Sequence, residues 1–316
     1  FTVLYEFNEK VLALEKQGKK IVKLNVGQPD WRPPKEVINE AFLQLRNGRD
    51  RYASAWGENS LREKIAELHQ CDAENVVLFP GSKQAIYSIL ATQANSGDEV
   101  AFFTPHWTAY EKICEQLKLS VKKVPLTQEQ KFQPTAEILS SHLTKKTKII
   151  ILNSPNNPTS IAFSEKQEKQ IQQIARENNS LLITDDAYRD LSFDGRKPRA
   201  LEEGIAITHT FSKTFGMAGW RIGYSVTSPE LARRLVSLNQ ITFSNVPVFL
   251  QLAAEKALER RTSFVEKIRK TSKTRALLAE TLLSNLDVVP PNAGFCVFPR
   301  LKNNSDATNF CFKLLE

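Results

Sequence analysis

Residues 205–213 read Ile205-Ala-Ile-Thr-His-Thr-Phe-Ser-Lys213 and place a lysine in an unusual position. The apolar run at the start is typical of a buried parallel strand, and a turn of small residues follows it. A lysine at the end of such a strand is costly unless it takes part in chemistry, because burial and nearby cations favour the neutral amine. A neutral amine condenses with aldehydes, and Arg221 is close enough in sequence to supply a positive neighbour and a phosphate ligand.

Strand-like and helix-like segments alternate on both sides of this stretch, from about residue 75 to residue 230. This alternation indicates an α/β fold with a mostly parallel central sheet and helices on both faces. In open sheets of this kind ligands bind outside the carboxyl ends of the strands, where the polar motifs of this chain fall. The predicted strands are 76–79, 99–103, 148–153, 180–184, 205–209 and 220–226, and the predicted helices between them are 82–94, 106–117 and 165–178.

The pattern changes after Pro229, which begins a long helical stretch that reaches beyond residue 280. The pair Pro290-Pro291 breaks this stretch. The run Gly294-Phe-Cys-Val-Phe298 that follows predicts a strand of a second, smaller unit.

Composition excludes several classes of protein. The 316 residues carry a formal charge of +8, with 41% hydrophobic and 25% charged residues, which is ordinary for a soluble globular protein. The densest basic run, Arg260 to Arg275, alternates with acidic and apolar residues, so we favour a solvated helix face over a nucleic-acid interface. No apolar run approaches the ~20 residues of a membrane span, and no signal-peptide pattern opens the chain. Widely spaced cysteines and histidines predict a cytoplasmic protein with reduced thiols and no metal site.

Three turns that follow predicted strands carry groups able to bind a ligand. The turn Gly81-Ser82-Lys83 opens a helix, where backbone N–H groups and the helix dipole attract anions, although an ordinary strand-to-helix turn has the same pattern. Trp107 follows the next strand and could stack on a planar ring, although a lone tryptophan is more often part of a core. The loop Asn153-Ser-Pro-Asn-Asn-Pro-Thr159 is more rigid and polar than a turn requires.

The segment Thr184-Asp-Asp-Ala-Tyr188 ends the strand that precedes Lys213. Asp185 is expected to face the crevice, where a carboxylate pairs with a protonated ring nitrogen and keeps it charged. The Tyr188 hydroxyl is placed to hydrogen-bond a phenolic oxygen. A surface Asp-Asp turn is the alternative, weakened because two successive acids would lie against an apolar strand.

Taken together and in this order, these residues resemble the fold-type I pyridoxal-phosphate aminotransferases of class I, the aspartate aminotransferase family. The resemblance extends from Leu24-Asn-Val-Gly-Gln-Pro-Asp30 through Arg51-Tyr-Ala-Ser-Ala-Trp-Gly57 to Ala293-Gly-Phe295, nearly the whole chain. The most specific motifs are Ser154-Pro-Asn-Asn-Pro-Thr159, Ser212-Lys213 and Gly219-Trp-Arg-Ile-Gly-Tyr224.

The resemblance implies one cofactor, pyridoxal 5'-phosphate, and a role for each residue around it. Lys213 would form the internal aldimine and then act as the general base, while Asp185 would pair with the pyridine nitrogen. Asn157 and Tyr188 would bond the ring hydroxyl, and Trp107 would stack on the ring. Gly27, Asn157 and Trp107 would also contact the substrate. The phosphate would be held by Gly81, Ser82, Lys83, Thr210, Ser212 and Arg221, and by Tyr52 from the neighbouring subunit of a homodimer.

The resemblance also implies a large cofactor-binding domain, residues 30–265, and a smaller α+β domain built from both chain ends, residues 1–29 and 266–316. We expect the small domain to be incomplete, because the family's arginine for the substrate α-carboxylate would lie beyond Glu316. The segment Ala66–Asp72 is shorter than its counterpart in relatives, and the chain opens at Phe1 without a methionine, which suggests missing residues or a fragment.

Two positions depart from the family's pattern. Ser160 stands where the family usually has a glycine, which a backbone without positive φ would tolerate. His106 precedes Trp107 where several relatives carry an aromatic residue, and this affects the expected substrate contacts.

The leading functional hypothesis is an amino-acid aminotransferase with aspartate and 2-oxoglutarate as the expected substrates. Alanine, aromatic, methionine or specialised biosynthetic amino acids remain alternatives as substrates. A lyase or decarboxylase on the same scaffold, and a domain that only senses pyridoxal phosphate, are the alternative activities. The expected partners are small molecules and a second copy of the chain, with no nucleic acid and no membrane.

Overall fold

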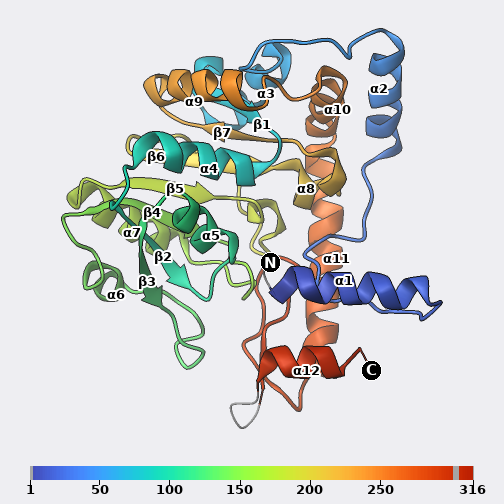
Figure 1. Ribbon diagram of the computed structural model, residues 1–316, viewed down its shortest axis with the longest axis vertical. Coiled ribbons are helices and arrows are strands. Elements are labelled where there is room, and N and C mark those ends of the chain that lie inside the picture. The colour runs from blue at the N-terminus through green and yellow to red at the C-terminus, as the bar shows by residue number, and fades with distance from the viewer. Residues whose placement is uncertain (1–2, 302–305, 316) are drawn as a thin grey trace.

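A seven-stranded sheet forms the centre of the protein in the computed structural model, which describes residues 3–301 and 306–315 (Figure 1). Among the described strands of this sheet, β7 alone runs antiparallel to its neighbours, which confirms the predicted mostly parallel sheet. In spatial order the strands are β1 (Val76–Phe79), β7 (Gly223–Val226), β6 (Ile205–Thr210), β5 (Leu181–Asp185), β4 (Thr147–Asn153), β2 (Glu99–Thr104) and β3 (Ser120–Pro125).

The edge strand β3 has no counterpart among the predicted strands. Lys122 and Lys123 interrupt its apolar pattern, and most of its residues are partly or fully exposed. Charged side chains are common on edge strands because they discourage pairing with another chain. The same lysines therefore concealed the strand from an analysis based on apolar runs.

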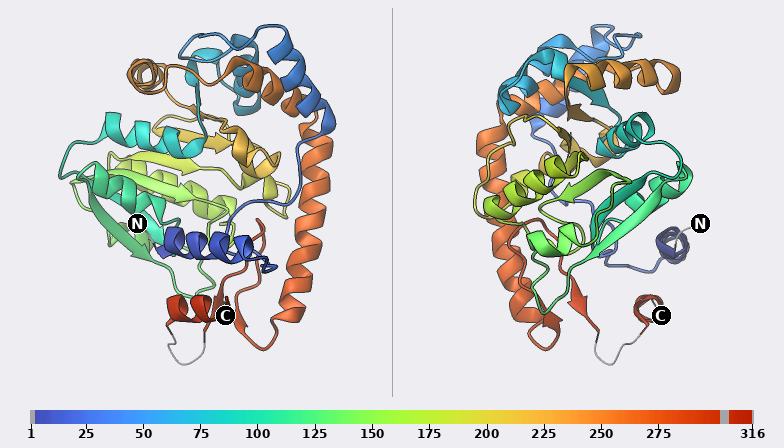
Figure 2. Two further views of the ribbon diagram at one scale, coloured as in Figure 1. Left: turned by 45° about the vertical axis from the view of Figure 1, so that its right-hand side comes forward. Right: turned by 90° about the vertical axis from the view of Figure 1, so that its left-hand side faces the viewer.

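Helices cover both faces of the sheet, as predicted (Figures 1 and 2). Two apolar clusters, one on each face, form the core, and successive residues of a central strand alternate between them. In β5, for example, Leu182 belongs to one cluster and Ile183 to the other. One face is covered by α4 (Ser82–Gln93), α5 (Ala109–Gln116) and α9 (Pro229–Thr242); the other by α3 (Asn59–His69), α6 (Ala136–Ser140), α7 (Glu165–Glu177) and α10 (Val248–Glu259).

The long helical stretch predicted from Pro229 is three helices. After α9 the chain turns through Ser244, whose φ is 63°, and Pro247 then precedes α10. A third helix, α11 (Arg261–Leu282), follows directly and runs along the edge of the layers (Figure 2). The expected domain boundary at residues 265 and 266 falls inside α11, so this helix is continuous across it.

A smaller unit lies at the far end of α11 (Figure 1). It contains the two-stranded antiparallel sheet of β8 (Asp287–Val288) and β9 (Pro299–Arg300), followed by α12 (Ala307–Lys313). The helix α1 (Val3–Lys16) lies beside α12, and the rings of Phe7 and Phe312 are 5.3 Å apart. The remaining helices, α2 (Lys35–Arg46) and α8 (Phe211–Thr214), belong to the main body.

The predicted strand 294–298 is wrong. Gly294 has a φ of 65°, a left-handed conformation that strands do not adopt, and its N–H bonds to Leu191 O at 3.0 Å. The segment is thus tied to a neighbouring turn, and the strand begins only at β9. In the described parts of the chain, no helix is long and apolar enough to cross a membrane.

Candidate functional site

Lys213 lies in the one-turn helix α8, directly after the carboxyl end of β6. Its amine donates a hydrogen bond to Gly27 O and lies 5.8 Å from the centre of the Tyr188 ring. The indole of Trp31 donates to the backbone oxygens of Lys213 (3.1 Å) and Thr214 (3.2 Å). The N-terminal segment therefore crosses the end of the sheet and fixes the backbone on which the lysine stands.

Burial lowers the pKa of the Lys213 amine below the ordinary lysine value. The positive charges of Arg221 and Lys83 lower this pKa further, while Cys296 and Asp185 raise it. This is the environment predicted for Lys213, because desolvation and nearby cations both favour the neutral amine.

Asp185 is buried at the end of β5, on the face that carries α5. Its carboxylate accepts hydrogen bonds from the Tyr110 hydroxyl (2.6 Å) and from the Ala187 N–H (3.2 Å). Burial raises the pKa of Asp185 to about 6, and the two hydrogen bonds oppose that shift. The described surroundings thus supply neutral donors to this carboxylate, and a cation placed beside it would stabilise its charge.

The asparagine loop and Tyr188 meet at this end of the sheet. The Asn157 side chain donates to the Tyr188 hydroxyl at 3.2 Å. Asn153 fixes the loop, because its side chain accepts from the Asn157 N–H (2.8 Å) and donates to Asp185 O (2.9 Å). Asn157, Tyr188, Asp185 and Lys213 are therefore brought together, as the sequence predicted.

The first turn of α4 faces the same end of the sheet, and no side chain in the described parts of the chain caps it. The Arg221 guanidinium lies over Gly81, where a Cβ would come within 2.8 Å of its Nη2. This guanidinium is held by the backbone oxygens of Ala218 (2.9 Å) and Pro80 (3.0 Å). A Cβ on Gly223 would meet Ser82 N at 2.8 Å, so β7 can pack against this turn only through a glycine.

Two buried hydroxyls stand beside the turn. The Thr210 hydroxyl donates to the Ser212 hydroxyl at 2.9 Å and accepts from the Ser212 N–H at 3.2 Å. Together with Ser82, Arg221 and the uncapped N–H groups of α4, they form a compact set of donors and one positive charge. Such a set fits a phosphate group, because helix N-termini and guanidinium groups both bind phosphate oxygens.

Trp107 and Lys83 lie together, with the lysine amine 5.1 Å from the centre of the indole ring. Trp107 also packs edge-on against Tyr110, with ring centres 5.5 Å apart, so it stands beside the Asp185 partner. Tyr52 behaves differently: its side chain is 92% exposed. The structure brings the other predicted residues to one end of the sheet and leaves Tyr52 facing outward.

Among the described residues of the site, Tyr110 and Trp31 were not selected from the sequence, and Asn153 was quoted only as part of its loop, without a role of its own. Tyr110 and Trp31 bond partners 75 and 182 residues away in sequence, so no local pattern announces them. Asn153 opens the quoted asparagine loop, and its position at a strand end is the signal by which it could have been chosen.

Ser160 corrects another expectation. Its φ is 54°, so the serine occupies the left-handed conformation that its presence was expected to exclude. The Ser160 N–H bonds to Asn156 O at 2.9 Å and its hydroxyl accepts from the Cys296 N–H at 3.0 Å. These bonds offset part of the strain that a side chain with Cβ meets in this region.

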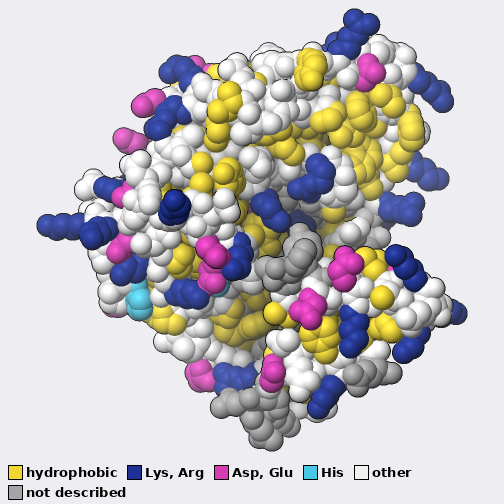
Figure 3. Space-filling model, in the orientation of Figure 1, with side chains coloured by type: hydrophobic (Ala, Val, Ile, Leu, Met, Phe, Trp, Pro, Cys, Tyr) yellow, Lys and Arg dark blue, Asp and Glu magenta, His cyan; other side chains and the backbone are white. Residues whose placement is uncertain are grey.

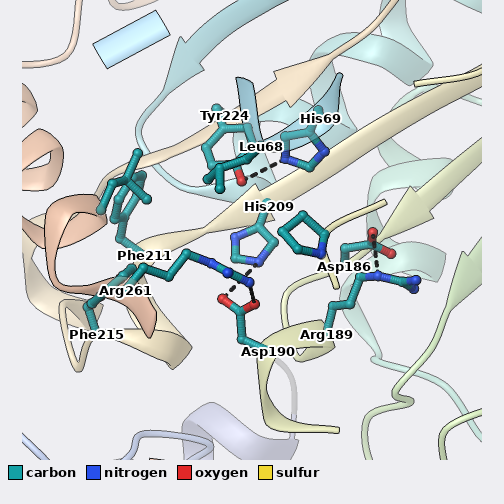
Figure 4. A pocket seen from close by; sticks show the side chains of 12 residues that line it. Leu68, His69, Asp186, Arg189, Asp190, His209, Phe211, Phe215, Tyr224 and Arg261 are labelled. Atoms are coloured by element: carbon teal, nitrogen blue, oxygen red, sulfur yellow. Dashed lines mark hydrogen bonds and ion pairs between the residues drawn. The ribbon is translucent and has the colours of Figure 1, made fainter. Parts of the chain in front are cut away.

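A second group of charged residues lies on the opposite face of β5 and β6 (Figure 4). Asp190 is buried and bonded to Arg261 and to the Thr214 hydroxyl (3.0 Å). His209 Nε2 lies 3.8 Å from Asp190 Oδ2. The other ring nitrogen, Nδ1, is buried without a hydrogen-bond partner among the described residues. The group encloses a cavity with room for about one water molecule. It lies behind α8 and supports that turn from the core.

Comparisons with known proteins agree with this geometry. A family model described as aminotransferase class I and II matches residues 19–316. The chain is 32% identical over 314 residues to an aspartate aminotransferase of Thermococcus kodakarensis, covering 99% of this chain and 82% of that protein. It is 31% identical to an asparagine-oxo-acid transaminase of Streptococcus mutans, covering 96% and 83% respectively. Among solved structures, an aspartate aminotransferase of Thermotoga maritima superposes with a TM-score of 0.92 at 29% identity, covering 100% of this chain and 86% of that chain.

Proposed function

The chain belongs to the class I and II aminotransferase family, and from this premise we propose how its own residues carry out the reaction. It is a pyridoxal-phosphate-dependent amino-acid aminotransferase of fold type I. When bound, the cofactor supplies an aldehyde that condenses with amines and a ring that withdraws electrons from the substrate α-carbon. The parts proposed below concern which residues hold that group, which substrates enter, and how the chain assembles.

We assign Lys213 as the residue that joins the cofactor aldehyde and then carries the substrate proton. Its lowered pKa keeps a larger share of the amine neutral, and a neutral amine can remove the proton from the substrate α-carbon. Its hydrogen bond to Gly27 O holds Nζ at the surface of the site. This placement, an amine held beside Tyr188 at the end of β6, is the observation that carries the proposal.

The neighbouring residues would bind and orient the cofactor. Asp185 would hold the proton of the ring nitrogen, since its buried carboxylate gains a cationic partner there. Asn157 and Tyr188 would bond the ring oxygen, and Trp107 would cover the ring face. The phosphate would be held by Gly81, Ser82, Lys83, Thr210, Ser212 and Arg221.

The first test replaces the lysine by Lys213→Ala. We expect this variant to keep binding the cofactor, measured by absorbance after desalting, and to lose transamination by at least ~10⁴-fold, because nucleophile and base are removed together. Lys146→Ala, at an exposed lysine, is the matched control and should behave as the wild type. Full turnover by Lys213→Ala would overturn the assignment.

For the substrates we propose an L-amino acid of the aspartate type and 2-oxoglutarate. Support comes from the aspartate aminotransferases among the relatives and from Trp107. The asparagine-oxo-acid transaminase matches almost as closely, so sequence identity alone does not choose between the two. A panel of amino acids with 2-oxoglutarate or pyruvate, ranked by kcat/KM, tests this; a best substrate other than aspartate would replace it.

We further propose that two copies of the chain share their sites through Tyr52. Apolar side chains gather over α2 in the space-filling view (Figure 3). Phe42, Leu43 and Leu45 of this helix are exposed. Exposed apolar patches of this kind mark protein interfaces. The exposed Tyr52 side chain follows that helix and would reach the phosphate of the other copy.

Mixing Lys213→Ala chains with Tyr52→Ala chains tests this sharing. A hybrid of Lys213→Ala and Tyr52→Ala chains contains one site with both native residues, so a refolded equal mixture should regain about a quarter of the wild-type sites. Each variant refolded alone is the control. No recovery in a mixture shown to contain hybrids would contradict the shared site.

The domain division and the location of the protein complete the proposal. We propose residues 30–265 as the cofactor-binding domain and residues 1–29 with 266–316 as the smaller domain. Limited proteolysis of the loaded protein should cut first in the segment between α1 and α2, near residues 29 and 30, while the boundary at residues 265 and 266, inside the helix α11, should resist cleavage. A cytoplasmic location is proposed because all four cysteines are free thiols. Fractionation of cells that express the protein tests it.

A further inference from the structure

The contact between Ser160 and the segment 292–296 joins the asparagine loop to the connection that leads into the smaller unit. Ser160 accepts the Cys296 N–H on its hydroxyl at 3.0 Å and the Asn292 N–H on its backbone oxygen at 3.2 Å. Asn292 in turn bonds the Ala162 backbone from both ends of its amide, at 2.6 and 3.2 Å. The loop and the segment are therefore fastened side by side over several residues.

Ser160 and Gly294 fit together as a pair. A Cβ on Gly294 would lie 2.8 Å from the Ser160 hydroxyl oxygen, which is closer than a Cβ can approach. Both residues have left-handed backbones, with φ values of 54° and 65°. A serine in this conformation is strained relative to glycine, and the hydrogen bond from the Cys296 N–H to its hydroxyl offsets part of that strain.

The segment that Ser160 contacts continues into residues that border the site. The ring of Phe295 packs against the rings of Tyr188 and Trp31, with ring centres 5.6 and 5.7 Å apart, respectively. Cys296 is partly buried next to it, and the thiol and the Lys213 amine are close enough to affect each other's pKa. Phe295 and Cys296 thus form a wall of the site beside Lys213, and the hydrogen bond to the Ser160 hydroxyl fixes this wall on the side away from the lysine.

We propose that Ser160 is a positioning residue which sets Phe295 and Cys296 against Tyr188 and Lys213, and through them selects the amino-acid substrate. The inference rests on the proposed role of Lys213, and it adds a determinant that lies outside the residues in contact with cofactor. Ser160 acts through its hydroxyl, because its other contact to the segment uses the backbone oxygen that any residue carries.

The test compares Ser160→Gly with Ser160→Ala and with Asn179→Gly. Ser160→Gly removes both the hydroxyl and the strain, whereas Ser160→Ala removes the hydroxyl and keeps the strain. Asn179 is exposed and has a φ of 56°, so its replacement by glycine is the matched control for relief of strain alone. Cofactor content is measured for each variant by absorbance and should not change.

Two measurements report the position of Phe295 and Cys296. The rate at which Cys296 reacts with a small thiol reagent, followed on its peptide by mass spectrometry, should rise ~3- to 10-fold in both Ser160 variants, as expected for one lost hydrogen bond. The ratio of kcat/KM between the best and second-best amino acids should change by a similar factor, mainly through KM. Asn179→Gly should alter neither quantity.

A double-mutant cycle with Gly294→Ala adds an independent measurement. The substitution should raise KM strongly with Ser160 present, because Cβ and hydroxyl collide, and less in the Ser160→Gly background. Unchanged thiol rates and unchanged substrate ratios in both Ser160 variants would overturn the proposal. If the wild type transferred no amino group, the proposed function would fail, while the thiol rate would still decide the role of Ser160.

Discussion

Asp185 and Asp186 are neighbours in sequence and face opposite sides of the sheet. Asp185 bonds Tyr110 and the Ala187 N–H, and burial raises its pKa to about 6. Asp186 is equally buried, but its partners are Arg199, 3.3 Å away, and Arg189, 3.9 Å away. Although burial opposes it, the charge of these arginines holds the pKa of Asp186 below the ordinary value.

The difference shows that neighbours, more than burial, decide the charge of a carboxyl group in this protein. On the side of Asp186 the protein supplies its own cations, and the group is part of a buried network that includes Glu168. On the side of Asp185 the described contacts are neutral hydrogen-bond donors, which leaves the positive partner to the ligand. One strand end thus carries two buried acids, one residue apart: Asp186, which is paired with arginines, and Asp185, which we assign to the cofactor.

The largest expected effect is on stability, from Asp186→Asn. Removing one partner of a buried ion network leaves its arginines uncompensated, which costs about 3–5 kcal/mol in the free energy of unfolding. Denaturant unfolding of the cofactor-free protein measures it. Activity per folded molecule should stay within ~3-fold, and Glu202→Gln, at the exposed pair with Arg176 (3.3 Å), should cost less than about 1 kcal/mol.

Asp185→Asn should have the opposite effects: a large loss of activity and no loss of stability. We expect kcat to fall by ~10²- to 10³-fold, as for loss of one preorganised electrostatic partner, because the asparagine cannot hold a protonated ring nitrogen. The free energy of unfolding of the cofactor-free protein at pH 7 should not fall, since a buried charge has been removed. If Asp185→Asn destabilised the protein as much as Asp186→Asn while preserving kcat, the comparison would fail.

The two acids should also differ in their pH dependence. Asp185 has a folded-state pKa above its unfolded value, so its protonated form stabilises the folded protein at low pH and that contribution is lost as pH rises through about 6. The shift from 3.8 to about 6 corresponds to about 3 kcal/mol, which Asp185→Asn should remove from the stability profile of the cofactor-free protein. Asp186, with its lowered pKa, has the opposite sign: its contribution is present at neutral pH and lost on acidification. Denaturant midpoints between pH 4 and 7 distinguish the two.

The smallest change is Tyr110→Phe, which removes one donor from Asp185. The hydrogen bond lowers the pKa of Asp185, so its loss should raise this pKa further, and the pH through which the cofactor-free protein loses the Asp185 contribution to stability should move upward by about one unit. At pH 8, where Asp185 remains ionised, kcat should change by less than ~5-fold. Denaturant midpoints of the cofactor-free variant between pH 4 and 8 that match those of the wild type would contradict this role of Tyr110.

The carboxyl ends of the central strands could be located from the sequence because apolar runs mark central strands, and ligands bind where those strands stop. The side on which Asp185 lies follows from the alternation of side chains along β5. The arginines around Asp186 could not be predicted, since Arg199 and Arg189 come from loops and turns whose path no periodicity describes.

Two failures have a common cause. The run 294–298 looks like a strand because its residues are apolar, and Ser160 looks compatible with an ordinary backbone because serine seldom has a positive φ. The contact between the two segments overrides both local preferences, because Gly294 and Ser160 take left-handed conformations where the segments meet. Contacts between distant segments cannot be read from either segment alone.

The hydrogen bonds of Trp31 set a condition on the order of folding. This residue joins the backbone at Lys213 and Thr214, 182 and 183 residues further along the chain. A ribosome that adds ~5–20 residues per second takes about 10–40 s to make that length. During this interval the backbone oxygens of Lys213 and Thr214 do not yet exist, so the Trp31 indole is exposed to solvent or makes other contacts. Trp31 can therefore close the lysine turn only after residues 213 and 214 have been made, while β7 and the helices α9 and α10 are still to follow.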